Sequence, residues 1–132
     1  MAQKVEDITI SNSIFYDLGT GAVLVSSQYW DLLVCSGINV TNNFIQKGGR
    51  VFPSTSAILY SRIHDSSITH NYISDFYYTA IAIGWSWDYG DQTTYGVKIA
   101  FNYIEDLMQG WLSDGDCVYT LGFVQNVIIE HN

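Results

Sequence analysis

A chain of 132 residues is long enough for one ordinary domain and no more. With 48% hydrophobic residues, 14% charged residues and a single proline, the composition excludes a disordered chain. Five basic residues against 13 acidic residues give a net charge of −8, so the surface would repel phosphate backbones and anionic lipids. We therefore expect no nucleic-acid partner and no membrane partner.

One short pattern recurs from the N-terminus to the C-terminus. In each copy an alternating apolar pair precedes a polar turn, and an isoleucine or a phenylalanine follows the turn. The apolar anchors of successive copies are spaced by 30, 28, 31 and 30 residues. Self-similarity of this period is typical of a solenoid, in which no repeat buries its apolar face alone. The anchors are Ile10, Val40, Ile68, Ile99 and Ile129.

The turn of each repeat carries a polar residue at a fixed position. Ser13 stands in the first copy where the later copies have Asn43, Asn71, Asn102 and Asn132. If the repeats stack, these asparagines form an internal ladder in which each amide bonds to its neighbours, because buried amides need hydrogen-bond partners. The turn also suits asparagine, which tolerates left-handed backbone.

A second apolar strand follows the turn in every repeat, and a third segment leads back to the next anchor. The length between turn and second strand varies, so we expect loops at that corner. Three short strands per turn and no helical periodicity predict an all-β parallel β-helix of about four coils of 28–31 residues. A leucine-rich repeat would need a leucine consensus, and a β-sandwich would give no asparagine column. The second strands begin with Ala22-Val23, Ala57-Ile58, Ala80-Ile81 and Cys117-Val118.

Repeat material begins near the N-terminus, where residues 1–7 do not resemble a signal peptide, and a fifth copy stops at Asn132. No capping element is recognisable at either end. We therefore expect residues 1–132 to be part of a larger solenoid, open at both ends and prone to self-association through unpaired strand edges. Cys35 and Cys117 fall at different points of the repeat, so we predict two buried free thiols and no disulfide.

Two tryptophans mark the end of the second strand in the third coil. Trp85 and Trp87 flank Ser86, so on a strand both indoles would point to the same side. Two exposed indoles on one face would make a platform on which sugar rings stack. In the alternative arrangement, one indole packs against the coil and the other covers a loop, and the sequence leaves both open.

Two carboxylates, Asp114 and Asp116, lie on the loop that enters the second strand of the next coil. Glycosidases use a pair of carboxyl groups, about 5 Å apart for retention or about 6.5–9.5 Å apart for inversion. A β-helix can supply such a pair from neighbouring coils. Taken alone, however, two acids in a loop are more often a solvated turn.

The histidines do not predict a metal site. His70 and His131 share the turn position before the asparagine, and His64 stands apart. No cysteine or carboxylate lies at ligand spacing, so we expect no metal and no cofactor. Asp75 and Asp106 also share one position of the repeat, and we interpret them as turn residues.

Several short blocks of the chain occur in a characteristic order: Asn43-Phe44-Ile45, Gly49-Arg50-Val51-Phe52-Pro53, His70-Asn71-Tyr72-Ile73, Asp75-Phe76-Tyr77-Tyr78, Gly84-Trp85-Ser86-Trp87, and Ser113-Asp114 through Tyr119-Thr120-Leu121-Gly122. In this order they resemble the right-handed parallel β-helix glycoside hydrolases. Members of this family are secreted or periplasmic bacterial enzymes that act on plant or host polysaccharides, with fucosidase, xylanase and xylosidase activities among them. The resemblance covers essentially the whole chain. Its most specific motifs are Gly84-Trp85-Ser86-Trp87 and Ser113-Asp114 followed by Tyr119-Thr120-Leu121-Gly122.

The resemblance implies that Asp114 is a catalytic carboxylate and that its partner lies about one coil further on, past Asn132. It also implies an extracellular or periplasmic location for the parent protein. The family usually has glycines where this chain has Gly115-Asp116-Cys117, and the Asp116 charge would raise the pKa of Asp114 by repulsion. The residues expected to contact sugar are Trp85, Trp87, Asp116 and Tyr119.

Two functional hypotheses follow. In the first, the chain is a carbohydrate-active module of a glycosidase that cleaves a poly- or oligosaccharide, with Asp114 as the one member of the carboxylate pair present. In the second, it is a carbohydrate-binding or adhesin-like β-helix without catalysis. A polysaccharide lyase fits less well, because the basic residues lie far from Asp114 in sequence: Lys47, Arg50, Arg62 and Lys98.

Overall fold

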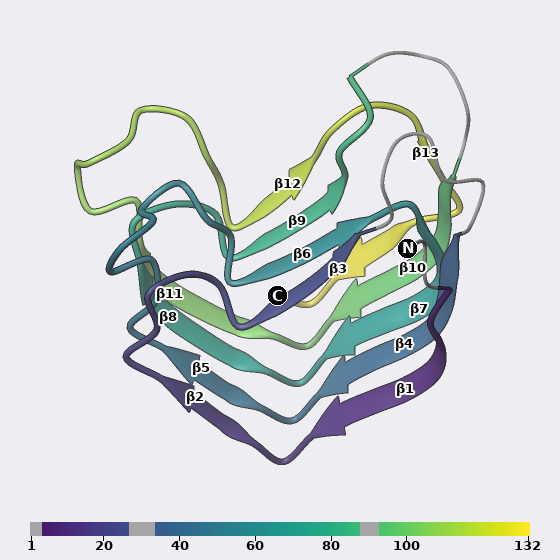
Figure 1. Ribbon diagram of the computed structural model, residues 1–132, viewed down its shortest axis with the longest axis horizontal. Coiled ribbons are helices and arrows are strands. Elements are labelled where there is room, and N and C mark those ends of the chain that lie inside the picture. Colours follow the sequence, from purple (N-terminus) through teal and green to yellow (C-terminus); the bar gives the residue numbers. More distant parts are fainter. Residues whose placement is uncertain (1–3, 27–33, 88–92) are drawn as a thin grey trace.

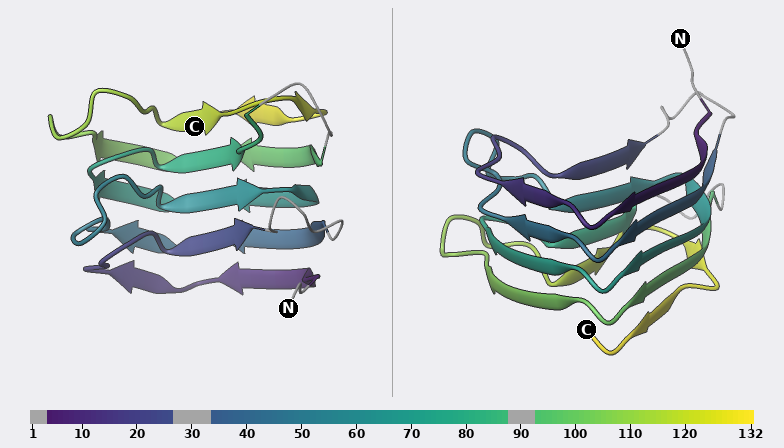
Figure 2. Two further views of the ribbon diagram at one scale, coloured as in Figure 1. Left: turned by 45° about the horizontal axis from the view of Figure 1, so that its top comes forward. Right: turned by 90° about the horizontal axis from the view of Figure 1, so that it is seen from below.

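The computed structural model describes residues 4–26, 34–87 and 93–132. The chain is an all-β parallel β-solenoid of about four turns, and the residues described include no helix (Figure 1). Each turn contributes one strand to each of three sheets, so the strands of successive coils lie directly above one another (Figure 2). The fold predicted from the repeat is confirmed.

The anchor strands form the longest sheet. Its register places the predicted anchors side by side, with Ile10 beside Val40, Ile68 beside Ile99 and Ile99 beside Ile129. In the last coil the strand is interrupted, and both of its parts pair with the strand of the coil before. The strands are β1 (Glu6–Ser11), β4 (Cys35–Thr41), β7 (Ile63–Thr69), β10 (Thr94–Ala100), β13 (Val124–Gln125) and β14 (Ile128–Glu130).

The other two sheets have four strands each. One follows the asparagine turn and contains β2 (Ile14–Tyr16), β5 (Phe44–Gln46), β8 (Tyr72–Phe76) and β11 (Tyr103–Leu107). The other contains β3 (Val23–Ser26), β6 (Ile58–Ser61), β9 (Ile81–Gly84) and β12 (Val118–Thr120). The predicted second strands are in register, because Val23 pairs with Ile58, Ile58 with Ile81, and Ile81 with Val118.

The core is a set of β-branched columns inside the coils. Alternate residues of each strand point inward, and stacking places an apolar residue of one coil on the same residue type of the next. Ile45 and Ile73 pair in one sheet, Val40 and Ile68 in another, and all four are fully buried. Such columns explain the period-two alternation that predicts the strands.

The asparagine ladder is present and its hydrogen-bonding capacity is used. Nδ2 of Asn43 donates to Oδ1 of Asn71, and Nδ2 of Asn71 donates to Oδ1 of Asn102, both at 3.0 Å. Nδ2 of Asn102 continues the ladder to Oδ1 of Asn132 at 2.8 Å. Each Oδ1 also accepts the backbone N–H of the residue at the same position in the preceding coil, which is Ser13 for Asn43 and an asparagine for the others. Each Nδ2 also donates to the anchor carbonyl of the preceding coil.

Left-handed residues recur at aligned positions of the coils, where φ lies between 48° and 80°. The columns of Asn12 and of Arg62 lie at corners between sheets, the column of Asp17 lies at or near the ends of the second-sheet strands, and the column of Asp7 lies mostly within the anchor strands. Asp75 and Asp106 share one such column, but they lie within β8 and β11 rather than in the predicted turns. The columns are Asn12, Asn42, His70, Phe101 and His131; Asp17, Lys47, Asp75 and Asp106; Arg62, Trp85 and Gly122; and Asp7, Gly37, Asp65, Gly96 and Asn126.

The two cysteines differ in burial. Both are free thiols, and Cys35 is buried at 3% exposure, as predicted. Cys117 is exposed, so its predicted burial is wrong. It occupies the same position as the buried Ala57 and Ala80, but β12 pairs with β9 alone and has no strand on its other side.

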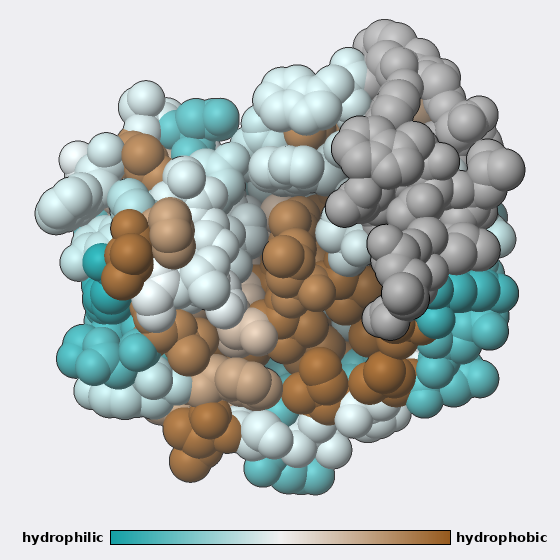
Figure 3. All heavy atoms as spheres, in the orientation of Figure 1, coloured by the Kyte–Doolittle hydropathy of each residue, from teal (hydrophilic) through white to brown (hydrophobic). Residues whose placement is uncertain are grey.

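One end of the solenoid opens onto its apolar interior. There β1, β2 and β3 each pair with a single strand, and a cavity of about 260 Å³ is lined by residues such as Val5, Ile10 and Phe15. Hydrophobic side chains accordingly gather in the middle of the face shown in Figure 3. Self-association through such an edge stays a prediction. Over the residues that the structure places, no helix is long and apolar enough to cross a membrane.

Candidate functional site

Three loops leave the same corner of successive coils. They connect β5 to β6, β8 to β9, and β11 to β12, and they lie beside one another at the left of Figure 1. Backbone hydrogen bonds join them, because the N–H of Ala57 donates to the carbonyl of Thr79 and the N–H of Met108 to that of Phe76. Side chains distant in sequence therefore meet where the loops reach the sheet of β3, β6, β9 and β12.

Asp114 lies in a hollow formed by these loops. The hollow has a volume of about 360 Å³, and we name it the Asp114 hollow. Ligand pockets in proteins run from about 300 to 1,000 Å³, so this one suits a small ligand or one unit of a larger ligand. Its lining residues are Ser54, Tyr78, Trp85, Leu112, Ser113 and Asp114.

Two aromatic residues, Tyr78 and Trp85, line the hollow with Asp114. The ring of Tyr119, on β12, lies 5.7 Å from that of Trp85 and 6.5 Å from that of Tyr78, measured between centroids. Burial, and next the negative charge of Asp114, raise the pKa of Tyr78. The phenol of Tyr78 is therefore protonated at neutral pH and can donate a hydrogen bond beside the Asp114 carboxylate.

The loop that carries Asp114 is packed against the coil below. A side chain at Gly115 would come within 3.1 Å of Oγ1 of Thr79, in the coil below, and within 2.5 Å of Sδ of Met108, in the same loop. The N–H of Asp116 donates to the same hydroxyl of Thr79 at 3.2 Å. These contacts fix the backbone on the C-terminal side of Asp114.

The carboxylate of Asp75, in the preceding coil, binds the N-terminal part of the loop that carries Asp114. Asp75 accepts hydrogen bonds from the guanidinium of Arg50 and, at 2.6 Å, from Nε2 of Gln109. The guanidinium lies over the ring of Tyr77 at 4.8 Å, and that ring lies 5.0 Å from the ring of Trp111. One carboxylate thus connects the loops of three successive coils.

The stability contributed by this carboxylate will depend on pH. Burial by itself would raise the pKa of Asp75, but the hydrogen bonds from Arg50 and Gln109 and the Arg50 charge outweigh it and lower the pKa. A lowered pKa means that the ionised carboxylate stabilises the fold above the ordinary pKa of 3.8, and that this stability is lost as the pH falls through the folded-state pKa.

Asparagine tolerates the left-handed backbone at this position, so Asp75→Asn should lower the melting temperature at pH 7 and make little difference at pH 2–3. A deficit of equal size at both pH values, measured by circular dichroism, would contradict this.

Of the predicted site residues, Asp114 and Trp85 line one hollow, and Tyr119 lies behind it against the rings of Trp85 and Tyr78, whereas Asp116 and Trp87 stand apart. The carboxylate of Asp116 accepts the N–H of Cys117 at 2.7 Å, and Asp116 does not line the hollow. Trp87 is 83% exposed and lies outside the lining. The expectation that Trp85 and Trp87 share one face of a strand is wrong, because β9 ends at Gly84 and Trp85 occupies a left-handed corner with φ 59°.

Three lining residues were not predicted. Ser54 follows the single proline of the chain, Tyr78 belongs to the loop of the third coil, and Leu112 precedes Ser113. Ser54 and Tyr78 stand on different coils from Asp114, and the loops differ in length, so no spacing in the sequence relates them. Across the described parts of the chain, no group of three or more histidine, cysteine or acidic residues could hold a metal ion.

Comparisons of the chain with protein-family models, with curated proteins and with solved structures find no match. Function is therefore inferred from the chemistry of the site.

Proposed function

We propose that the chain binds a poly- or oligosaccharide in the Asp114 hollow as part of an extracellular or periplasmic glycoside hydrolase. The observation that carries the proposal is the meeting of Asp114 with Trp85 and Tyr78 in one hollow. A sugar ring has an apolar C–H face, which stacks on an aromatic ring, and hydroxyl groups, which hydrogen-bond to carboxylates and hydroxyls. Ser54 and Ser113 supply further hydroxyls to the same hollow.

In the catalytic part of the proposal, Asp114 is one of two carboxyl groups that act on the glycosidic bond. One such group protonates the leaving oxygen, and the other acts as nucleophile or activates a water molecule. Asp114 is the one carboxylate in the described lining of the hollow, since the Asp116 side chain bonds to its own loop. Hydrolysis therefore requires a second carboxylate from beyond these lining residues.

The same observation favours a second candidate, a carbohydrate-binding β-solenoid without catalysis. Binding needs the aromatic rings and hydroxyls that the hollow contains, and it needs no carboxylate pair. The two candidates differ in whether the bound saccharide is cleaved.

Binding is tested with soluble polysaccharides such as xylan and fucoidan in affinity electrophoresis. We expect Trp85→Ala to weaken retention by at least tenfold, because it removes the ring that stacks on the sugar. Trp87→Ala is the matched control and should change retention less than about twofold, because Trp87 lies outside the hollow. A larger effect at Trp87 than at Trp85, or no retention by any polysaccharide, would contradict binding in the Asp114 hollow.

Catalysis is tested by release of reducing sugar from the retained polysaccharide, using the protein that contains this chain. If Asp114 is a general acid or base, Asp114→Asn lowers the rate by roughly 10²–10⁴-fold and leaves retention nearly unchanged. Asp116→Asn is the control and should keep most of the rate. Retention without any hydrolysis by the unmodified protein would establish the binding candidate instead.

A further inference from the structure

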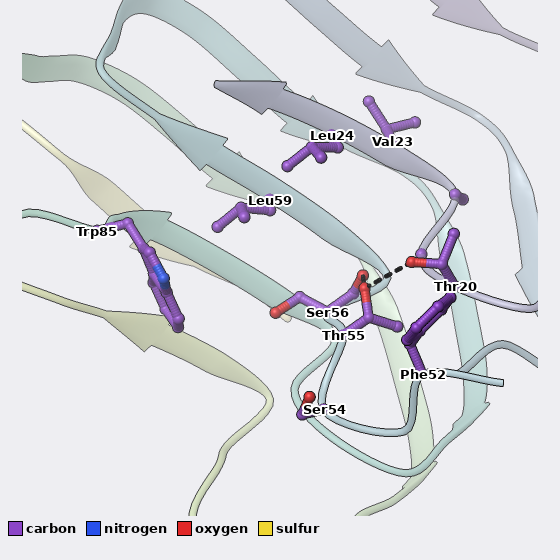
Figure 4. Close-up of a pocket in the computed structure, with 11 residues that line it drawn as sticks. Thr20, Val23, Leu24, Phe52, Ser54, Thr55, Ser56, Leu59 and Trp85 are labelled. Atoms are coloured by element: carbon purple, nitrogen blue, oxygen red, sulfur yellow. Dashed lines mark hydrogen bonds between the residues drawn. The ribbon is translucent and has the colours of Figure 1, made fainter. Parts of the chain in front are cut away.

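A second hollow lies next to the Asp114 hollow on the same flank. It has a volume of about 380 Å³, and it shares the lining residues Ser54 and Trp85 with its neighbour. We name it the Phe52 hollow, after the aromatic residue that stands across it from Trp85 in Figure 4. Trp85 therefore contributes to the lining of both hollows, which are of similar size.

The lining of the Phe52 hollow is uncharged and suits a sugar. Leu24 and Leu59 pair side by side on β3 and β6, and they present aliphatic surface on the outer face of the sheet. Hydroxyl groups lie between the two aromatic walls in Figure 4, and they belong to Ser54, Thr55 and Ser56. Apolar surface beside a row of hydroxyls complements a ring with one C–H face and several hydroxyl groups.

Phe52 is exposed although its backbone is fixed. The N–H groups of Val51 and Phe52 both donate to the carbonyl of Gly19 at 2.9 Å. The hydroxyl of Thr20 donates to that of Thr55 at 3.2 Å, the contact drawn in Figure 4. The side chain of Phe52 nevertheless remains 64% exposed. An exposed aromatic ring on a fixed backbone is a surface on which a ligand stacks at small entropic cost.

We infer that the two hollows are successive subsites for one extended oligosaccharide, which crosses the coils along the solenoid axis with Trp85 between its units. The inference rests on the proposed function and specifies its ligand as a chain rather than a single terminal sugar. The strands β3, β6, β9 and β12 that floor this flank are spaced by about 4.8 Å each, so β3 to β12 spans about 14 Å. That span accommodates more than one sugar ring.

The experiment measures affinity against ligand length. Xylo-, cello- and fuco-oligosaccharides from one to six units are titrated into the protein by isothermal calorimetry, with Phe52→Ala and Trp85→Ala as variants. We expect the affinity to rise at least tenfold from the monosaccharide to the longer members of the series that binds. Phe52→Ala should remove most of that rise and leave the affinity for the monosaccharide within twofold. Trp85→Ala should weaken ligands of every length.

One control variant and one milder variant of the Phe52 hollow accompany these measurements. Tyr103→Ala removes a ring of similar exposure, 61%, from a different sheet, so it should not alter the length dependence. Thr20→Val keeps the shape of the loop and removes the hydroxyl that bonds Thr55, so it should weaken long ligands by a smaller factor than Phe52→Ala.

The outcomes separate this inference from the function on which it rests. If oligosaccharides bind and Trp85→Ala weakens them, but affinity does not rise with length or Phe52→Ala has no effect on long ligands, the extended site is wrong and the proposed function stands. If no oligosaccharide of any length binds, both are wrong. Unchanged melting temperatures of the variants show that the losses do not come from unfolding.

Discussion

Replacing Asn71 with alanine is expected to lower the free energy of unfolding by roughly 3–6 kcal/mol. Asn71 is 1% exposed and lies in the middle of the ladder. Its removal takes a hydrogen bond from two backbone groups, the N–H of Asn43 and the carbonyl of Val40. A buried group left without a partner costs about 1–3 kcal/mol, and lost bonds to the side chains of Asn43 and Asn102 add to this.

Such a loss is large beside the total stability of a domain, about 5–15 kcal/mol. Thermal unfolding should therefore begin roughly 10–25 °C lower in Asn71→Ala. Asn39→Ala is the control, because Asn39 lies on the outer side of β4 and bonds Ser67 and the carbonyl of Gly37. We expect Asn39→Ala to cost about 1 kcal/mol or less. Equal losses in the two variants would show that burial of the ladder does not determine its contribution.

Hydrogen exchange gives a local measure of the same interaction. The backbone N–H of Asn43 donates to Oδ1 of Asn71 at 3.0 Å, so Asn71→Ala should speed its exchange. In contrast, the backbone N–H at position 71 donates to Oδ1 of Asn102 in the next coil, and that acceptor is retained in the variant. Protection lost first on the Asn43 side would show that each asparagine supports the coil below it.

The ladder was predictable from sequence because stacking repeats the same requirement in every coil. The side chain at the ladder position must donate to a carbonyl of one coil and to a side chain of the next while it also accepts. Asparagine meets this requirement, so Asn43, Asn71 and Asn102 recur at a visible period. Ser13 departs from the pattern where less is required of the side chain, since its N–H donates to Asn43 and its hydroxyl donates to the carbonyl of Ser11.

The corner columns were only partly predictable, because their conformation depends on backbone geometry more than on residue type. Asparagine and aspartate occupy several corners and can be recognised as turn residues. Phe101 and Trp85 occupy two different corners with φ 58° and 59°, and neither residue type favours left-handed backbone. The register of the neighbouring strands imposes the left-handed conformation at these positions. An alternating strand pattern in the sequence therefore gives the wrong direction for the Trp85 side chain.

The candidate site was predictable as a set of residue types but not as an arrangement. Asp114, Trp85 and Tyr119 belong to motifs that stand out in the sequence; Asp114 and Trp85 line one hollow, and Tyr119 contacts Trp85. Tyr78 and Ser54 complete the hollow from loops of other coils. The proximity of Tyr78 and Ser54 to Asp114 depends on the conformation of the loops, which the repeat period does not determine.

Gly48→Ala is expected to destabilise the protein by about 2–3 kcal/mol. Gly48 is buried at the start of the loop that carries Phe52, and the ring of Phe76 packs over it. A Cβ at Gly48 would come within 2.0 Å of Cε1 and 2.2 Å of Cζ of Phe76. Phe76 is itself fully buried, so the ring has no open space into which it can move.

A double-mutant cycle tests whether this contact is the cause. Phe76→Leu removes the ring atoms nearest to Gly48, so Gly48→Ala should cost about 1 kcal/mol less in the Phe76→Leu background than in the unmodified protein. Gly19→Ala is the matched control, because its Cβ would approach no closer than 3.3 Å, to a methyl group of the exposed Val51. We expect it to cost less than about 1 kcal/mol by urea unfolding. Additive costs of Gly48→Ala and Phe76→Leu would show that the loop backbone, rather than the ring, requires glycine at this position.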